Sequence, residues 1–163
     1  MGRQISFKVG IIGCGLIGFK RSKYLGSRGK LVACADVNVI RAKKIAINKK
    51  IKVFTDWKKL LDVKEIDIVI ISTPHNQLSK ILLHAYKKKK HVLVEKPGAK
   101  NLKEISRVIS KVNNNKIKIR VGFNHRYHPS IIKALEIIKL EIIGKPMYLR
   151  ARYGHGGRLG YEK

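Results

Sequence analysis

The residues whose types and spacing point most directly to chemistry are three glycines in the segment GCGLIG, at positions 13, 15 and 18. Between a strand and a helix, Gly13 permits the tight turn, Gly15 lets a pyrophosphate approach the backbone, and Gly18 lets the helix pack closely on the strand. The N–H groups of Leu16 and Ile17 would then face the anion at the positive end of the helix dipole. The spacing therefore predicts a dinucleotide site, with a structural turn that binds no ligand as the alternative.

Asp36 follows the glycines and stands at the tip of the next expected strand. Its carboxylate is placed to accept hydrogen bonds from the adenine ribose hydroxyls and would repel the extra phosphate of NADP, which favours NAD. Arg41, one turn into the following helix, opposes this preference because a guanidinium there could bind a 2′-phosphate. Arg41 is equally well explained as an ordinary solvated helix residue. The expected cofactor is NAD, with NADP as the other candidate.

Two short motifs, Ser72-Thr73-Pro74 and Glu95-Lys96-Pro97, lie where the fourth and fifth expected strands end. Ligands of open α/β sheets bind outside the carboxyl ends of the strands, so both motifs are expected to border the nicotinamide. Lys96 is the candidate catalytic residue, because an ammonium near a substrate hydroxyl can stabilise developing negative charge or relay a proton. The alternative is one more surface lysine among many, although its place at a strand end sets Lys96 apart.

Strands that alternate with helices must position these residues. Nearly unbroken apolar runs predict strands buried on both faces, and apolar residues at helical spacing predict helices between them. The expected strands are 7–12, 31–35, 51–54, 66–72, 91–94 and 117–123, and the expected helices are 16–25, 39–48, a short one capped by Asp56, 76–88 and 102–112. This alternation predicts an α/β fold with a doubly wound parallel sheet of Rossmann type, in strand order 3-2-1-4-5-6.

The pattern changes after Asn124. Residues 129–143 have the pattern of a helix, with Pro129 in its first turn and Gly144 at its end. Residues 147–153 alternate like the first strand of a half-exposed antiparallel sheet, but one helix and one strand cannot bury a core of their own. The chain is therefore expected to hold a nucleotide-binding domain at 1–124 and, at 125–163, the opening helix and strand of a truncated α+β domain.

The composition combines ample apolar content with an unusual charge. Hydrophobic residues make up 44% of the chain, and 37 lysines and arginines against 10 acidic residues give a formal charge of +27. Such a charge makes attraction to nucleic acid plausible. The basic residues are mostly lysines spread along the chain, however, whereas a nucleic-acid site would mix arginine with stacking aromatics. We interpret the charge as compositional bias and expect no nucleic-acid partner.

Cys14 and Cys34 each lie in a short apolar run, which indicates buried thiols and neither a disulfide framework nor a metal site. No apolar run reaches the length that spans a bilayer, and the first residues lead into a strand without the layout of a signal peptide. These features predict a cytoplasmic protein with no membrane association and no bound metal.

Five motifs occur in a fixed order along the chain: GIIGCGLIG, Asp36, STP at 72–74, HVLVEKP at 91–97 and GFNHRYHP at 122–129. In this combination the chain resembles the Gfo/Idh/MocA oxidoreductases, whose members oxidise or reduce sugars, cyclitols and related compounds with NAD(P). The resemblance covers essentially the whole chain. It implies that Lys96 is the family's lysine near nicotinamide and substrate, and that Asn124 and Arg126 lie beside the cofactor at the junction of two domains.

Two departures from the family pattern stand out. Many members have Asn-x-x-His after the Thr-Pro, where this chain has His75-Asn76-Gln77-Leu78, so the contacts of that loop carry over only in part. His75 either lines the cofactor or substrate pocket or caps the helix that follows. Family members are also much longer, and their second domain supplies an Asp/His pair that completes the catalytic site.

The leading hypothesis is an amino-terminal fragment of an NAD(P)-dependent oxidoreductase that acts on a sugar, nucleotide sugar or cyclitol by hydride transfer. Whether the chain alone is an enzyme stays open, because the proton would also need a second-domain histidine. The expected partners are a sugar-like substrate, a chain that supplies the second domain, or further copies of this chain. The alternatives are a dinucleotide-binding regulatory module and, less favoured, a basic nucleic-acid-binding protein.

Overall fold

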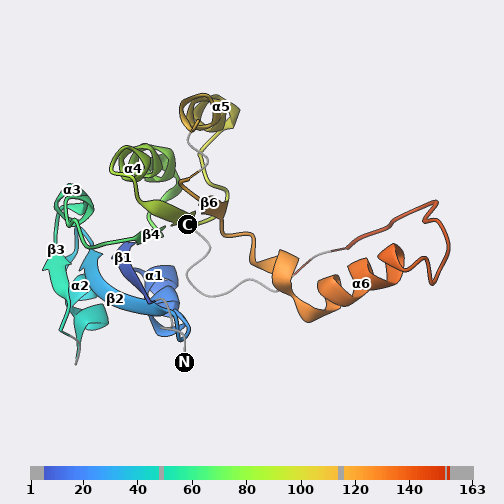
Figure 1. Ribbon diagram of the computed structural model, residues 1–163, viewed down its shortest axis with the longest axis horizontal. Coiled ribbons are helices and arrows are strands. Elements are labelled where there is room, and N and C mark those ends of the chain that lie inside the picture. The colour runs from blue at the N-terminus through green and yellow to red at the C-terminus, as the bar shows by residue number, and fades with distance from the viewer. Residues whose placement is uncertain (1–5, 48–49, 114–115, 153, 155–163) are drawn as a thin grey trace. The chain divides into compact units, whose positions relative to one another are not determined.

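The apolar runs of the sequence form the six strands of one sheet. The computed structural model describes residues 6–47, 50–113, 116–152 and 154. The strands are β1 (Phe7–Ile12), β2 (Gly29–Ala35), β3 (Lys52–Phe54), β4 (Ile68–Ile71), β5 (His91–Val94) and β6 (Ile119–Val121). All neighbouring strands are parallel and their order is β3-β2-β1-β4-β5-β6 (Figure 1). The predicted Rossmann-type sheet is confirmed.

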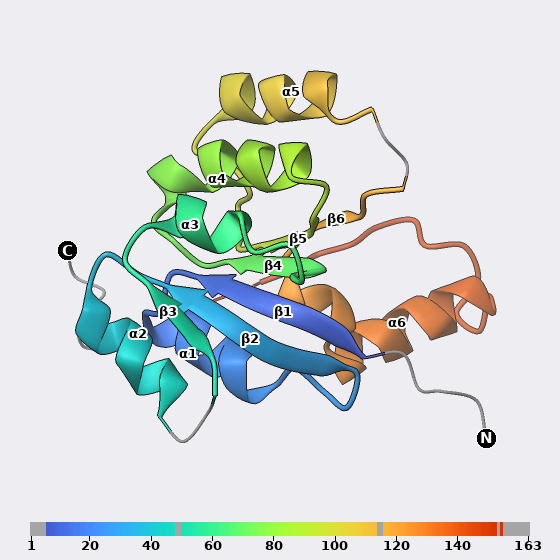
Figure 2. The ribbon, with the colours of Figure 1, turned by 60° about the vertical axis from the view of Figure 1, so that its left-hand side comes forward.

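Helices cover both faces of this sheet. α1 (Leu16–Lys23) and α2 (Val39–Ala46) pack on one face, and α3 (Trp57–Leu61), α4 (His75–Lys87) and α5 (Leu102–Lys111) pack on the other, as Figure 2 shows. Successive strand residues point to opposite faces, so Ile11 and Ile12 enter different apolar clusters, one beneath each helical layer. No helix in the described part of the chain is long and apolar enough to cross a membrane.

Side-chain caps set the starts of several helices. Asp56 accepts a hydrogen bond from the backbone N–H of Lys58, as predicted, and asparagines cap α2 and α5 in the same way. Several elements are shorter than predicted. α1, for example, ends at Lys23 and not at Leu25, because Tyr24 leaves the helical conformation and its N–H donates to the carbonyl of Arg21.

Lys90 is a buried lysine with a structural role. It follows α4, yet its Nζ donates to three carbonyl oxygens in the loop after α3, those of Val63 (3.0 Å), Lys64 (3.1 Å) and Ile66 (2.7 Å). Burial lowers the pKa of Lys90, and the nearby Asp67 opposes this effect. The ammonium thus holds the loop together through three carbonyls, and its hydrogen bond to the carbonyl of Ile66 is buried.

Replacing Lys90 with methionine is expected to lower the free energy of unfolding by about 2–3 kcal/mol, because three hydrogen bonds of the ammonium are lost, one of them buried, while the side-chain volume is kept. Urea denaturation followed by the fluorescence of the single tryptophan, Trp57, measures this loss. The matched control is Lys87→Met, at an exposed position of the same lysine run. Equal stability of the two variants would contradict the structural role of Lys90.

The chain divides into two units, Met1–Phe123 and Asn124–Lys163. The second contains, within its described residues, a 3-10 helix η1 (Asn124–Tyr127) and one α-helix, α6 (Pro129–Lys139). Pro129 occupies the first turn of α6, as predicted, and the His128 side chain accepts a hydrogen bond from the N–H of Ser130. The helix ends before the predicted Ile143, because Glu141 has a left-handed φ of 53°.

The strand predicted at residues 147–153 is wrong over its described part, since residues 147–152 adopt no strand conformation. A strand is stabilised by hydrogen bonds to a neighbouring strand, and the described residues of the second unit supply no such neighbour. Tyr153 lies outside the described residues. The alternation of apolar and polar side chains therefore did not by itself produce a strand here.

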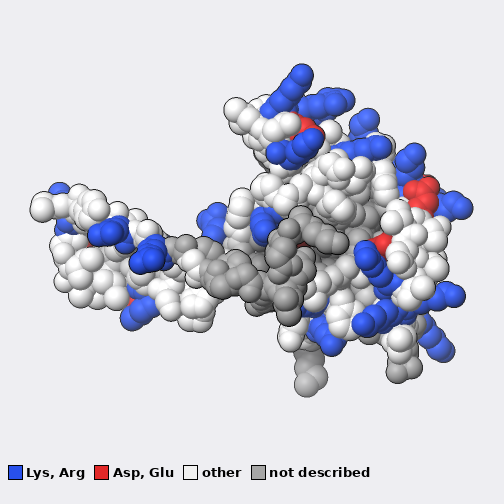
Figure 3. All heavy atoms as spheres, turned by 180° about the vertical axis from the view of Figure 1, so that it is seen from behind, with Lys and Arg blue, Asp and Glu red and all other residues white. Residues whose placement is uncertain are grey.

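Basic side chains are dispersed over the molecule. Figure 3 shows lysines and arginines spread across the face that it presents, with a few acidic side chains between them. Glu65, for example, lies 3.1 Å from Nζ of Lys8 and 3.2 Å from Nζ of Lys52, and hydrogen bonds from these two lysines lower its pKa. The dispersal supports compositional bias as the origin of the charge; the expectation of no nucleic-acid partner stays a prediction.

Candidate cofactor site

The three glycines of the turn between β1 and α1 occupy three different settings. Gly13 has a φ of +89°, and a Cβ at this position would lie 2.5 Å from the carbonyl oxygen of Ser72. A Cβ at Gly18 would overlap the carbonyl oxygen of Gly13, so this glycine allows α1 to approach the turn. Gly15 is different, because a Cβ there would meet nothing within 4 Å. Packing thus requires glycine at positions 13 and 18, whereas the space beside Gly15 is open.

The open space at Gly15 lies at the start of α1. Gly15 is the N-cap residue, no side chain caps this helix, and no acidic residue stands in its first turn. Leu16 and Ile17 follow with exposed side chains. Backbone N–H groups in the first turn of a helix have no partner within the helix and favour an anion. The geometry fits a pyrophosphate seated against Gly15.

The side chain of Asp36 is hydrogen-bonded to the backbone of the glycine turn. Its Oδ2 accepts a hydrogen bond from the N–H of Cys14 at 2.6 Å, and its Oδ1 accepts one from the N–H of Asn38 at 2.8 Å. These bonds orient the half-buried carboxylate beside the turn and leave each oxygen with a further lone pair for a ribose hydroxyl. Arg41 is exposed on α2, and Asn38 caps its backbone N–H.

The motif at the end of β4 packs against the same turn. The hydroxyl of Ser72 donates to the carbonyl of Gly13 at 2.9 Å. Thr73 follows with a buried Oγ1 that has no hydrogen-bond partner among the described residues. A buried hydroxyl without a partner is uncommon in a folded protein.

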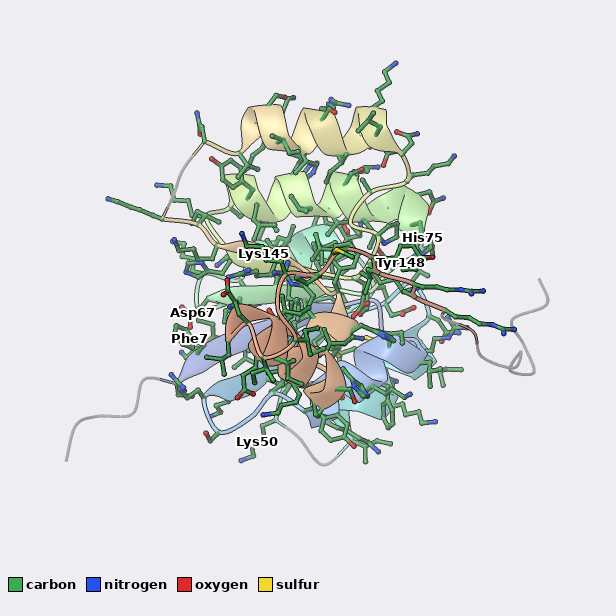
Figure 4. The ribbon with its side chains drawn as sticks, turned by 90° about the vertical axis from the view of Figure 1, so that its right-hand side faces the viewer. Phe7, Lys50, Asp67, His75, Lys145 and Tyr148 are labelled. Atoms are coloured by element: carbon green, nitrogen blue, oxygen red, sulfur yellow. The ribbon has the colours of Figure 1, made fainter. Side chains whose placement is uncertain are left out.

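His75 is the first residue of α4, and Pro74 is its N-cap, with no side-chain cap. The alternative in which His75 caps this helix is therefore wrong, because a residue inside the first turn is past the capping position. Its side chain is exposed. Figure 4 shows His75 at the end of the sheet opposite to Phe7 and Asp67, which mark where β1 and β4 begin.

Glu95 and Lys96, at the end of β5, differ sharply in environment. Glu95 is buried, and its Oε1 accepts hydrogen bonds from Nε (2.9 Å) and Nη2 (2.5 Å) of Arg21 on α1. Lys96 is exposed in a turn closed by the N–H of Gly98, which donates to the carbonyl of Glu95 at 3.0 Å. The bond between Lys96 and Pro97 is cis. Sequence reasoning missed Arg21, although a glutamate at a buried strand end signals a need for a cation.

Comparison with known proteins agrees with this geometry. Residues 7–123 match the model of the Gfo/Idh/MocA oxidoreductase family, which has an NAD-binding Rossmann fold. The chain belongs to this family. Its first unit is an NAD-binding Rossmann domain.

Similar family members include inositol dehydrogenases. The myo-inositol 2-dehydrogenase of Thermotoga maritima is 30% identical over 146 residues, which cover 88% of this chain and 44% of that protein. An uncharacterized oxidoreductase of Bacillus subtilis, YrbE, is 31% identical over 86% of this chain and 42% of its own length. A crystal structure is available of a Lactobacillus casei myo-inositol dehydrogenase in complex with NAD(H) and myo-inositol. It superposes on this chain with a TM-score of 0.82 and is 29% identical in sequence. The match covers 87% of this chain and 44% of that protein chain. The chain spans less than half the length of these relatives.

The NAD-binding domain brings together most of the predicted site. Gly13, Gly15 and Gly18 lie beside Asp36 on one side and beside the Ser72-Thr73 motif on the other. Asn124 and Arg126 belong to η1 in the second unit, directly after β6 along the chain. Their contact with the cofactor remains a prediction, as do the roles of Arg41 and His75.

The two cysteines lie within the NAD-binding domain as buried thiols, and they form no disulfide. Cys14 Sγ contacts the carbonyl of Ala35 at 3.5 Å, and Cys34 Sγ contacts that of Ala42 at 3.4 Å. A hydrogen bond with Cys34, followed by burial, raises the pKa of the Cys14 thiol. A raised pKa of this kind is typical of a structural buried cysteine. Among the described residues, no three histidine, cysteine or acidic side chains gather in a way that would hold a metal ion.

Proposed function

We propose that this chain supplies the cofactor half of an NAD-dependent dehydrogenase that acts on a cyclitol or a related sugar. The observation that carries the proposal is the open space at Gly15. Next to it lies the carboxylate of Asp36, which is oriented by a hydrogen bond from the N–H of Cys14. The inositol dehydrogenases among the relatives support a polyhydroxylated ring as the substrate class. A nucleotide sugar is a less supported substrate.

In this proposal each residue has one task. The N–H groups of Leu16 and Ile17 hold the pyrophosphate, and Asp36 accepts hydrogen bonds from the adenine ribose. Bound NAD supplies the acceptor for a hydride from a substrate carbon that bears a hydroxyl. Lys96 lies near that hydroxyl, where its ammonium stabilises the developing negative charge or relays the proton.

The remaining part of the site would come from a second domain. We propose that residues 124–163 open this domain, whose completion lies in further polypeptide, a complementing chain or another copy of this chain. Substrate orientation depends on that domain, because hydride transfer requires the reacting atoms to be held in near-attack geometry. The isolated chain is therefore expected to bind NAD(H) without turning over substrate. Its two buried thiols, which form no disulfide, fit the reducing cytoplasm as its location.

The test combines binding with hydride transfer. NADH is titrated into the chain and followed by nicotinamide fluorescence, and absorbance of new NADH is then recorded with NAD and myo-inositol. In a second arm, residues 1–123 replace the matching domain of the Thermotoga maritima enzyme. The proposal expects binding in the first arm and Lys96-dependent turnover in the second. Binding with no turnover in the chimera would favour a regulatory dinucleotide-binding module, and absence of binding would overturn the proposal.

Asp36 is expected to set the cofactor preference. Changing Asp36 to alanine should weaken NAD binding roughly tenfold or more, because hydrogen bonds to a charged group contribute about 1.5–3 kcal/mol. The preference over NADP should narrow, since the carboxylate no longer repels the 2′-phosphate. Parallel titrations with both cofactors measure the two effects, with Asp56→Ala as a control at the N-cap of α3. If the unchanged chain binds NADP more tightly than NAD, the prediction is wrong, and Arg41 becomes the residue expected to bind the 2′-phosphate.

A further inference from the structure

An ion pair joins the helix that begins at the glycine turn to the strand end that precedes Lys96. Arg21 lies in α1 and Glu95 follows β5, and Nε and Nη2 of the guanidinium donate to the same carboxylate oxygen. The side chains of Arg21 and Glu95 are 27% and 12% exposed. Removing one residue of a pair so withdrawn from water is costly, because the other charge loses its nearby opposite charge.

A third element meets the ion pair. Gly122 follows β6, and its N–H donates to the carbonyl of Val94 at 2.8 Å. A Cβ at this position would lie 3.2 Å from Nη2 of Arg21 and 3.3 Å from Oε1 of Glu95. Any larger residue would press on the pair. The absence of a side chain at Gly122 thus makes room for the pair where α1 and the ends of β5 and β6 converge.

Glu95 is also the first residue of the turn that carries Lys96. The far end of this turn is fixed as well, because the N–H of Gly98 donates to the carbonyl of Glu95 and Gly98 is buried. Lys96 itself is exposed, and its flexible stem samples many rotamers. The position of the turn backbone therefore decides which volume the ammonium reaches.

We infer that Arg21 is a positioning residue, which holds the turn from Glu95 to Gly98 in a fixed place relative to the glycine turn so that Lys96 faces the nicotinamide. The inference rests on the proposed function, which places the nicotinamide near Lys96. It gives Glu95 a role through Arg21 in place of the direct cofactor contact expected from the sequence. The same short helix then holds the pyrophosphate at its first turn and aligns the lysine through Arg21.

The test measures how well bound NADH protects Lys96 from chemical acetylation. The whole chain is treated with acetic anhydride with and without saturating NADH, and acetylation of Lys96 is quantified by mass spectrometry. In the unchanged chain, NADH should slow this reaction roughly tenfold. In the double variant Arg21→Met, Glu95→Gln, which removes both charges at similar volume, the protection should fall below about threefold because the turn is no longer held in place. The NADH dissociation constant should change less than about threefold, since Gly15 and Asp36 are retained.

Two further variants make the outcome specific. Lys8→Met, Glu65→Gln removes an exposed ion pair elsewhere on the domain and should leave the protection unchanged. Arg21→Lys keeps the charge without the two-point contact and should give intermediate protection, which also provides the test if the double variant does not fold. Full protection in a folded Arg21 variant would overturn the inference and leave the proposed function intact. Absence of NADH binding, or of protection in the unchanged chain, would instead overturn the proposed position of Lys96 and the inference with it.

Discussion

Replacing Gly15 with valine is expected to abolish NAD binding and to leave the Rossmann domain folded. The backbone of Gly15 is extended, with φ −68° and ψ −166°, and nothing lies within 4 Å of a Cβ built there. A β-branched side chain is therefore accommodated, but it fills the volume where the pyrophosphate meets the backbone. Affinity should fall at least about a hundredfold, equivalent to about 2.7 kcal/mol, in a fluorescence titration with NADH.

Urea denaturation of the same variant provides the control for folding, because its midpoint should stay close to that of the unchanged chain. Gly154→Val is the matched substitution outside the domain, at another glycine whose Cβ would meet nothing within 4 Å. It should alter neither affinity nor stability. Unchanged affinity in a folded Gly15→Val chain would place the cofactor away from the glycine turn.

Replacing Gly18 with alanine should have the opposite signature, with a large loss of stability. The added Cβ would overlap the carbonyl oxygen of Gly13 and lie 2.9 Å from Oγ of Ser72. Backbone cannot move aside as a flexible side chain can, so the expected cost exceeds the usual range for overpacking and reaches about 3 kcal/mol or more. For a domain of ordinary stability this is a large share of the free energy of unfolding.

Gly15→Ala is the matched control for Gly18→Ala, because it adds the same methyl group three positions earlier, in open space. The two variants should separate widely in urea, with only Gly18→Ala shifted to a much lower midpoint. If Gly18→Ala unfolds at the same urea concentration as Gly15→Ala, then α1 does not pack on the turn as described.

Local sequence determined much of this protein. The apolar runs in β1 and β4 predicted buried parallel strands, and Asp56 marked the start of α3. The G-x-G-x-x-G spacing also predicted three different backbone settings, since each follows from the strand–turn–helix geometry that a few consecutive residues define. Features of this kind depend on neighbours along the chain, and a single sequence therefore reveals them.

Two features were decided only by the tertiary structure. Residues 147–152 have the alternation of a strand but no strand conformation, because a strand is stabilised by the element beside it and not by its own pattern. Arg21 and Glu95 are 74 positions apart along the chain, and neither residue indicates the other. They meet because the parallel crossovers bring the last turn of α1 next to the end of β5. The glycine turn could thus be predicted from the sequence, whereas the pairing of Arg21 with Glu95 could be found only in the folded domain.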